Sequence, residues 1–154
     1  MNKAKCAEWV AFGFGLGYAK KAPGTWGTLA AFPFYALMLF LPWPAYAFVT
    51  LLFFIGGVYL CDYVSKQLNC HDHPGIVWDE VVGMLIALFM VPPTLLNIVL
   101  AFLLFRLFDI FKPWPIRVLD ERVHGGMGIM LDDVVAGVFA CLCLHFLLFS
   151  VGIN

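Results

Sequence analysis

The charged residues of this chain are confined to three windows, 1–21, 62–80 and 106–133. The uncharged segments between and after these windows are 40, 25 and 21 residues long. A helix that crosses a bilayer needs about 20 apolar residues, and a charge placed inside the hydrocarbon is costly. The pattern therefore predicts an integral membrane protein whose chemistry is gathered at the ends of its membrane spans.

The composition limits the class of protein further. The chain has 154 residues, of which 63% are hydrophobic and 12% are charged. Because soluble domains carry about 25% charged residues, lipid must replace water over much of this surface. The length allows one domain, residues 1–154. A net charge of −1 without a basic patch argues against a nucleic-acid partner. The five cysteines show no metal-ligand spacing, so we expect them to be thiols.

The first uncharged segment is too long for one membrane span and fits two. Pro42-Trp43-Pro44 supplies the break, because proline cannot continue a helix interior and restricts the residue before it. We predict spans at about 25–41 and 45–62. A further span is predicted at about 132–150, in the last uncharged segment.

The middle uncharged segment has two interpretations, because Pro92-Pro93 divides it. As a single kinked span, it places the second and third charged windows on opposite sides of the membrane. As a hairpin with arms at about 76–91 and 94–111, it keeps all three windows on one side. Each arm is then 16 to 18 residues, roughly 24–27 Å long. We prefer the hairpin because it leaves the turns at 42–44 and 92–93 without a charge.

This interpretation gives an all-α polytopic protein with about five spans. Basic residues accumulate on the cytoplasmic side of membrane proteins, so we predict a cytoplasmic N-terminus and an external C-terminus. The basic residues gathered on that side are Lys3, Lys5, Lys20, Lys21, Lys66, Lys112, Arg117 and Arg122.

The hairpin also brings acidic residues together at the cytoplasmic ends of three spans. They are Asp79, Glu80, Asp109, Asp132 and Asp133. Several carboxylates near a low dielectric cannot all stay ionised without protons, basic side chains or a divalent cation. Magnesium is the natural cation, because it takes carboxylate oxygens and keeps waters for a phosphate. The alternative is that each acidic pair simply stabilises the N-terminus of a helix.

The basic residues near these acids also have two interpretations. Arg106 and Asp109 are three residues apart, so they share a helix face and can pair with each other, with or without a catalytic role. Lys112 and Arg117 follow in a Pro-rich stretch, where they can bind a phosphate or solvate the membrane surface. Pairing with the neighbouring Glu121 is a further possibility for Arg117.

Two segments can support ligand binding through less specific features. The glycine-rich segment 124–128 precedes Asp132 and Asp133, and its backbone N–H groups can face a phosphate or form a plain turn. His71-Asp72-His73 can coordinate a metal, although we favour a solvated polar loop. We expect His145, in the last span, to be packed or hydrogen-bonded.

Neither a G-x-S-x-G elbow nor a P-loop occurs in the chain. Carboxylates, cations and glycine-rich helix starts at one membrane face indicate a cation-assisted reaction on a phosphorylated lipid. Two other functions fit the same charges. One is a small ion-coupled transporter or channel subunit, with the acids in a cation or proton pathway. The other is a non-catalytic scaffold in which the charges fix the topology.

The motifs of the chain resemble those of the phosphatidylglycerophosphatase A family of bacterial inner-membrane lipid phosphatases. The resemblance covers about residues 9–140. The matching stretches are GFGLG at 13–17, PGTWGT at 23–28, HDH at 71–73, VWDE at 77–80, FRLFD at 105–109, KPWPIR at 112–117, VHGGMGIM at 123–130 and DDVVAG at 132–137.

The resemblance implies magnesium-dependent hydrolysis of phosphatidylglycerophosphate to phosphatidylglycerol and phosphate, at the cytoplasmic face of the inner membrane. Another lipid phosphomonoester is the nearest alternative substrate. The expected metal ligands, direct or through water, are Asp79, Glu80, Asp132 and Asp133, with Asp109 as a further ligand or a base. The expected phosphate-binding residues are Arg106, Lys112 and Arg117, together with Lys20 or Lys21. The attacking nucleophile is water or an aspartate.

Overall fold

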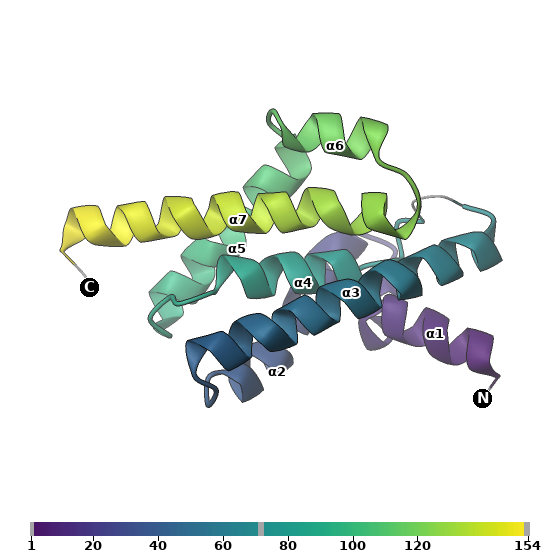
Figure 1. Ribbon diagram of the computed structural model, residues 1–154, viewed down its shortest axis with the longest axis horizontal. Helices are drawn as coiled ribbons and strands as arrows, with labels where there is room; N and C mark the ends of the chain where they lie inside the picture. The colour runs from purple at the N-terminus through teal and green to yellow at the C-terminus, as the bar shows by residue number, and fades with distance from the viewer. Residues whose placement is uncertain (1, 71–72, 153–154) are drawn as a thin grey trace.

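The computed structural model describes residues 2–70 and 73–152, and helices are the only regular secondary structure in these two ranges (Figure 1). The prediction of an all-α fold is confirmed. The elements are α1 (Lys3–Ala11), the 3-10 helix η1 (Gly13–Tyr18), α2 (Pro23–Met38), α3 (Trp43–Leu68), α4 (Trp78–Ala87), α5 (Leu95–Phe111), α6 (Ile116–Arg122) and α7 (Gly125–Val151).

The short helix α4 lies at the centre of the molecule. It packs against α2, α3, α5 and α7, and α7 makes its most extensive contact. Val81, Val82, Met84 and Leu85 on α4 are completely buried. After its acidic first turn α4 is apolar on nearly all sides, as expected for a core helix, and its neighbours cover most of it.

The breaks between helices contain proline at the predicted positions, although Pro33 lies inside α2. Pro42 lies between α2 and α3, and Pro92-Pro93 lies between α4 and α5. After the second break, the Thr94 hydroxyl accepts a hydrogen bond from the Asn97 backbone N–H at 3.2 Å, which starts α5. The chain then folds back, so that α4 and α5 form a hairpin. The α2–α3 turn, the α4–α5 turn and the C-terminal end lie at the left end of Figure 1.

Two helices are long and apolar enough to cross a bilayer: α3, over 26 residues, and the segment Gly125–Ser150 of α7. At 1.5 Å per residue each is about 39 Å long, which exceeds a hydrocarbon core of about 30 Å. Helix α4 has only ten residues, about 15 Å, so the predicted arm 76–91 is shorter than expected and cannot cross the core as a helix. The five-span topology and its orientation stay predictions.

Helix α7 begins at Gly125, seven residues before the predicted start at residue 132. The glycine-rich segment therefore forms the first turn of α7, and the prediction of a loop there is wrong. Asp62 on α3 stabilises this helix start, because its Oδ1 accepts a hydrogen bond from the Gly126 N–H at 3.3 Å. Asp132 and Asp133 consequently lie about two turns inside the helix.

Helices α4 and α7 cross at a pair of glycines. A Cβ atom added to Gly137 would lie 2.4 Å from the carbonyl oxygen of Gly83. Only glycine at position 137 permits this backbone approach, since the obstructing atom is itself backbone. The crossing sets the distance between the acidic residues at the start of α4 and those on α7.

Candidate functional site

A pocket of about 410 Å³ lies where α2 and α4 begin and where α5 ends. Helices α6 and α7 contribute the remaining walls. The residues that line it are Ala22, Pro23, Gly24, Pro74, Ile76, Asp79, Glu80, Arg106, Asp109, Ile110, Lys112, Asp120, Val123, Gly128, Ile129, Asp132 and Asp133. All five acids singled out in the sequence are among them, although they come from three different helices.

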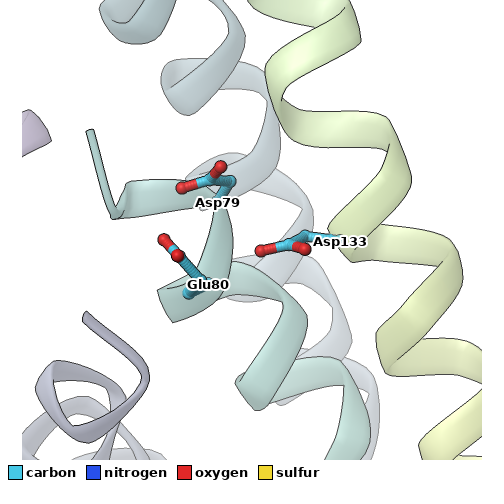
Figure 2. A group of neighbouring side chains, drawn as sticks. All are labelled: Asp79, Glu80 and Asp133. Carbon is cyan, nitrogen blue, oxygen red and sulfur yellow. The ribbon is translucent and has the colours of Figure 1, made fainter. Parts of the chain in front are cut away.

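Three of these acids form a close group. One carboxylate oxygen from each of Asp79, Glu80 and Asp133 lies within 4.8 Å of the other two. Asp79 and Glu80 occupy the first turn of α4, and Asp133 extends toward them from α7 (Figure 2). The acidic pair lies at the N-terminus of α4, where the helix dipole makes a negative charge most favourable.

The surroundings of this group fit a divalent cation. The Asp133 side chain is buried, with the residue only 2% exposed, and its Oδ2 has no hydrogen-bond partner among the described residues. The same holds for Oε2 of Glu80. Buried carboxylate oxygens that accept no hydrogen bond are costly unless a cation or proton compensates them. The carboxylates of Asp79, Glu80 and Asp133 together offer the oxygen ligands that magnesium prefers, beside a pocket that can hold part of its water shell.

Arg106 lies beside the acidic group. Its Nη1 pairs with Asp109, as the spacing predicted, and lies 3.8 Å from Oε1 of Glu80. The side chain is only 15% exposed, and its Nε has no hydrogen-bond partner among the described residues. Arg106 lines the pocket with N–H donors that are not all committed to the described residues.

The start of α2 closes one side of the pocket against these two side chains. A Cβ atom on Gly24 would lie 2.3 Å from Oε1 of Glu80 and 3.0 Å from Nη1 of Arg106. The absence of a side chain at Gly24 therefore allows both groups to adopt their positions. Sequence reasoning did not identify Gly24 as a site residue, because a glycine after a proline is also an ordinary helix start.

Lys112, which directly follows α5, forms a second charged group in the pocket lining. Its Nζ donates to Oδ2 of Asp132 and to Oδ1 of Asp120, each at 2.7 Å. Burial opposes the charge on this lysine, but the two carboxylates outweigh it and raise the pKa of Lys112 above its ordinary value. Lys112 therefore stays cationic throughout the physiological range.

Asp132 lies apart from the Asp79, Glu80 and Asp133 group, although all four were predicted as metal ligands. Neighbouring residues on a helix point about 100° apart, so Asp132 and Asp133 face different parts of the pocket. Asp132 binds Lys112 through Oδ2, while its Oδ1 has no hydrogen-bond partner among the described residues. A water-mediated role for Asp132 stays a prediction.

The other predicted phosphate-binding residues do not line the pocket. Lys20 and Lys21 are exposed just before α2. Arg117 is exposed on α6 and pairs with Glu121 at 2.9 Å, which is the surface pairing considered from the sequence. Their part in binding a lipid headgroup stays a prediction.

His145 is hydrogen-bonded as expected, whereas His73 is only partly exposed and its ring stacks on Phe12, with ring centroids 5.4 Å apart. His145 Nδ1 lies 2.8 Å from the Cys141 carbonyl oxygen. His73 Nδ1 accepts a hydrogen bond from the Gly75 N–H at 3.0 Å. His71 and Asp72 lie outside the described residues, and the possible metal site at 71–73 stays untested.

Comparison with known proteins agrees with the motifs. Residues 9–148 match the family model described as phosphatidylglycerophosphatase A. The chain is 51% identical to the phosphatidylglycerophosphatase A of Escherichia coli strain K12, over 90% of this chain and 81% of the relative. It is 44% identical to that of Haemophilus influenzae, over 86% of this chain and 83% of the relative.

A candidate phosphatidylinositol-3-phosphatase of Bacteroides thetaiotaomicron is 37% identical, over 88% of this chain and 89% of the relative. No solved structure matches the chain. The family model covers most of the chain. The Escherichia coli and Haemophilus influenzae relatives are also far more identical to it than family membership requires. The chain belongs to the phosphatidylglycerophosphatase A family and is a phosphoric monoester hydrolase.

Proposed function

We propose that this protein hydrolyses phosphatidylglycerophosphate to phosphatidylglycerol and phosphate, with magnesium as cofactor, at the cytoplasmic face of a bacterial inner membrane. The two relatives named phosphatidylglycerophosphatase A support the substrate. The single observation that carries the chemistry is the grouping of Asp79, Glu80 and Asp133 in one pocket with Arg106 and Lys112.

The two cations of the pocket suit the substrate's terminal phosphate. Arg106 presents a planar set of N–H donors that matches phosphate oxygens, and Asp109 fixes its orientation. Lys112 adds a point charge to the same pocket, where Asp132 and Asp120 hold it. A phosphomonoester in the pocket is then bound by both cations.

Asp79, Glu80 and Asp133 would hold the magnesium ion. When bound, the ion neutralises phosphoryl oxygens and lowers the pKa of a coordinated water. In the hydrolysis, a water oxygen forms a bond to phosphorus while the bond from phosphorus to the glycerol oxygen breaks, and that oxygen takes up a proton. Asp109 also lines the pocket and is a candidate base. An aspartyl-phosphate intermediate on one of the pocket acids is the alternative route.

Another lipid phosphomonoester is the second candidate substrate, and the Bacteroides relative favours it. The pocket recognises the phosphate through charge, and this recognition does not by itself distinguish the glycerol head from an inositol. Rates of phosphate release from phosphatidylglycerophosphate, phosphatidylinositol 3-phosphate and phosphatidic acid, measured side by side in the same micelles, decide between them. A higher kcat/KM for either of the last two would overturn the proposed substrate.

The test of the chemistry is phosphate release by the purified protein in detergent, with magnesium and with a chelator. We expect activity only with magnesium, and a loss of at least 10²-fold in Glu80→Gln, Asp133→Asn and the double variant. The double variant is included because neighbouring acids can replace one another. Glu8→Gln is the matched control, since Glu8 lies on α1 and hydrogen-bonds Tyr18 at 2.8 Å. Full activity in the double variant would remove the proposed centre.

Labelling of single cysteines tests the proposed orientation. Arg122→Cys, at the exposed end of α6, should react with an impermeant maleimide only after the cells are opened. Phe40→Cys lies in the α2–α3 turn, where the native side chain is 88% exposed, and should react in intact cells. Labelling is measured above that of the unsubstituted protein. The reverse pattern would place the pocket on the external side.

A further inference from the structure

One face of α5 is an exposed apolar stripe. Successive members are three or four residues apart, which places them along one side of a helix. Their exposed fractions lie between 44% and 64%. The members of this α5 stripe are Leu96, Val99, Leu103, Leu107 and Ile110.

The opposite face of α5 makes the packing contacts that hold the helix in place. Asn97, Ala101 and Phe105 are buried there. To either side, Phe102 contacts Phe32 of α2 with ring centroids 6.4 Å apart, and Phe108 contacts Phe139 of α7 at 5.7 Å. The α5 stripe therefore faces outward, between the two contacts.

The α5 stripe leads into the pocket. Ile110 is its last member and also lines the pocket, although it is 64% exposed. It follows Asp109 directly and lies one helical turn from Arg106, so an apolar surface meets the phosphate-binding cations at this point. From Leu96 to Ile110 the stripe extends about 21 Å along the helix, enough to follow a chain across one leaflet of about 15 Å.

We propose that an acyl chain of the substrate lies along the α5 stripe while its phosphate occupies the pocket, and that Ile110 determines specificity for long-chain lipid. The inference rests on the proposed function, since it assigns the lipid part of the same substrate. The occupant follows from continuity: an anionic head fits the cations, and Ile110 connects the pocket to the apolar α5 stripe along which an attached chain can extend. A second copy of the protein would satisfy the apolar face but not the charges.

We expect the α5 stripe to affect how the substrate is positioned, and not how strongly the lipid partitions into the membrane. Lipid tails are as apolar as leucine, so an exposed leucine gains little by exchanging one tail for another. A chain held at Ile110 instead limits how the glycerol and the phosphate are oriented over the acidic group. The expected effect is therefore on the preference for long chains, with long-chain and short-chain substrates compared in the same micelles.

The first experiment locates the chain directly in the wild-type protein. A non-hydrolysable phosphonate analogue of phosphatidylglycerophosphate carries a diazirine on one acyl chain and is photolysed with the protein in phosphatidylcholine vesicles. Labelling should concentrate on residues 96–110, and unlabelled analogue should compete while excess phosphatidylglycerol should not. Labelling spread equally over the exposed faces of α3 and α7, or insensitive to the analogue, would overturn the inference.

The second experiment measures specificity. In mixed micelles, Ile110→Ser should lower the ratio of kcat/KM for dipalmitoyl over dihexanoyl phosphatidylglycerophosphate about tenfold. Phe146→Ser is the control, because Phe146 is 70% exposed on α7 and does not line the pocket; its ratio should be unchanged. An equal loss on both substrates, or no loss, would contradict a role for Ile110 in chain specificity.

Two further outcomes separate the inference from its alternatives. If Leu103→Cys forms a disulfide-linked dimer in vesicles while the analogue labels no residue of α5, a second copy covers the stripe and the inference is wrong. If the wild-type protein releases no phosphate from any lipid, the proposed function fails, whatever the labelling pattern. Active enzyme labelled elsewhere leaves the function standing and removes only the stripe.

Discussion

Replacing Gly24 by alanine should damage catalysis without damaging the fold. The added Cβ would lie 2.3 Å from Oε1 of Glu80, while ordinary contacts begin at about 3.4 Å, so the carboxylate must retreat by about 1 Å. Arg106 gives no room, because its Nη1 and Nη2 would lie 3.0 and 3.2 Å from the same atom. The substitution therefore acts on a candidate metal ligand and a phosphate-binding cation at once.

A misplacement of 1 Å in a catalytic constellation can cost about 10²-fold, or about 2.7 kcal/mol of transition-state stabilisation. We expect kcat/KM for phosphate release to fall by that factor in Gly24→Ala, with a higher magnesium concentration needed for half-maximal rate. The thermal midpoint in detergent should not fall, because alanine is the better helix former and the obstructing atoms belong to side chains.

Gly56→Ala is the matched control. Gly56 lies in α3, and a Cβ there would meet nothing within 4 Å. The variant should keep full activity and gain up to about 1 kcal/mol in unfolding free energy, from the same difference in helix propensity. Wild-type kcat/KM in Gly24→Ala would refute the reasoning, because it would show that the position of Glu80 is not limiting.

Three further predictions follow from the packing and charges of the pocket. Gly137→Ala should lower the unfolding free energy by about 1–3 kcal/mol, measured by chemical unfolding in micelles, since the Gly83 backbone cannot yield; unchanged stability would contradict the close crossing. Lys112→Met should lower kcat/KM about 10- to 100-fold because Asp132 loses its partner, and Lys112→Arg should recover part of it; equal losses would deny a role for the charge. Chelation of magnesium should lower the thermal midpoint of the wild type but not of Glu80→Gln, and at a hundred times the dissociation constant the ion adds about 2.7 kcal/mol; no change in the wild type would indicate no bound ion.

The sequence was most informative where a local rule decides the structure. Proline disfavours a helix interior, and the chain does break at Pro42 and at Pro92-Pro93, although α2 continues through Pro33. The three-residue spacing of Arg106 and Asp109 determines a shared face, and the pair forms. The acidic pair at the start of α4 was also placed correctly, because the helix dipole favours Asp79 and Glu80 in a first turn.

The start of α7 could not be predicted from local propensity. Three glycines and a histidine in 124–128 favour a loop, because glycine is a poor helix former. In the structure a tertiary contact overrides that preference, since Asp62 on α3 accepts a hydrogen bond from the first turn of α7. The shift moved Asp132 and Asp133 into the helix interior, where they point to different partners.

Charge alone did not identify which basic residues reach the pocket. Lys112 and Arg117 belong to the same motif, yet only Lys112 lines the pocket, while Arg117 pairs with Glu121 on the surface. Gly24 was missed for the opposite reason, because it contributes space and no chemical group. Both distinctions depend on how α2 and α6 pack on their neighbours, which the order of residues does not reveal.

Binding of Mn²⁺, as a paramagnetic substitute for magnesium, tests the central arrangement most directly. Electron paramagnetic resonance of the purified protein should show a bound ion that is lost in Asp133→Asn and in Glu80→Gln, because each removes one donor from the group formed by α4 and α7. The Glu8→Gln protein should retain it. Undiminished Mn²⁺ binding in Asp133→Asn would contradict a shared cation site between the two helices.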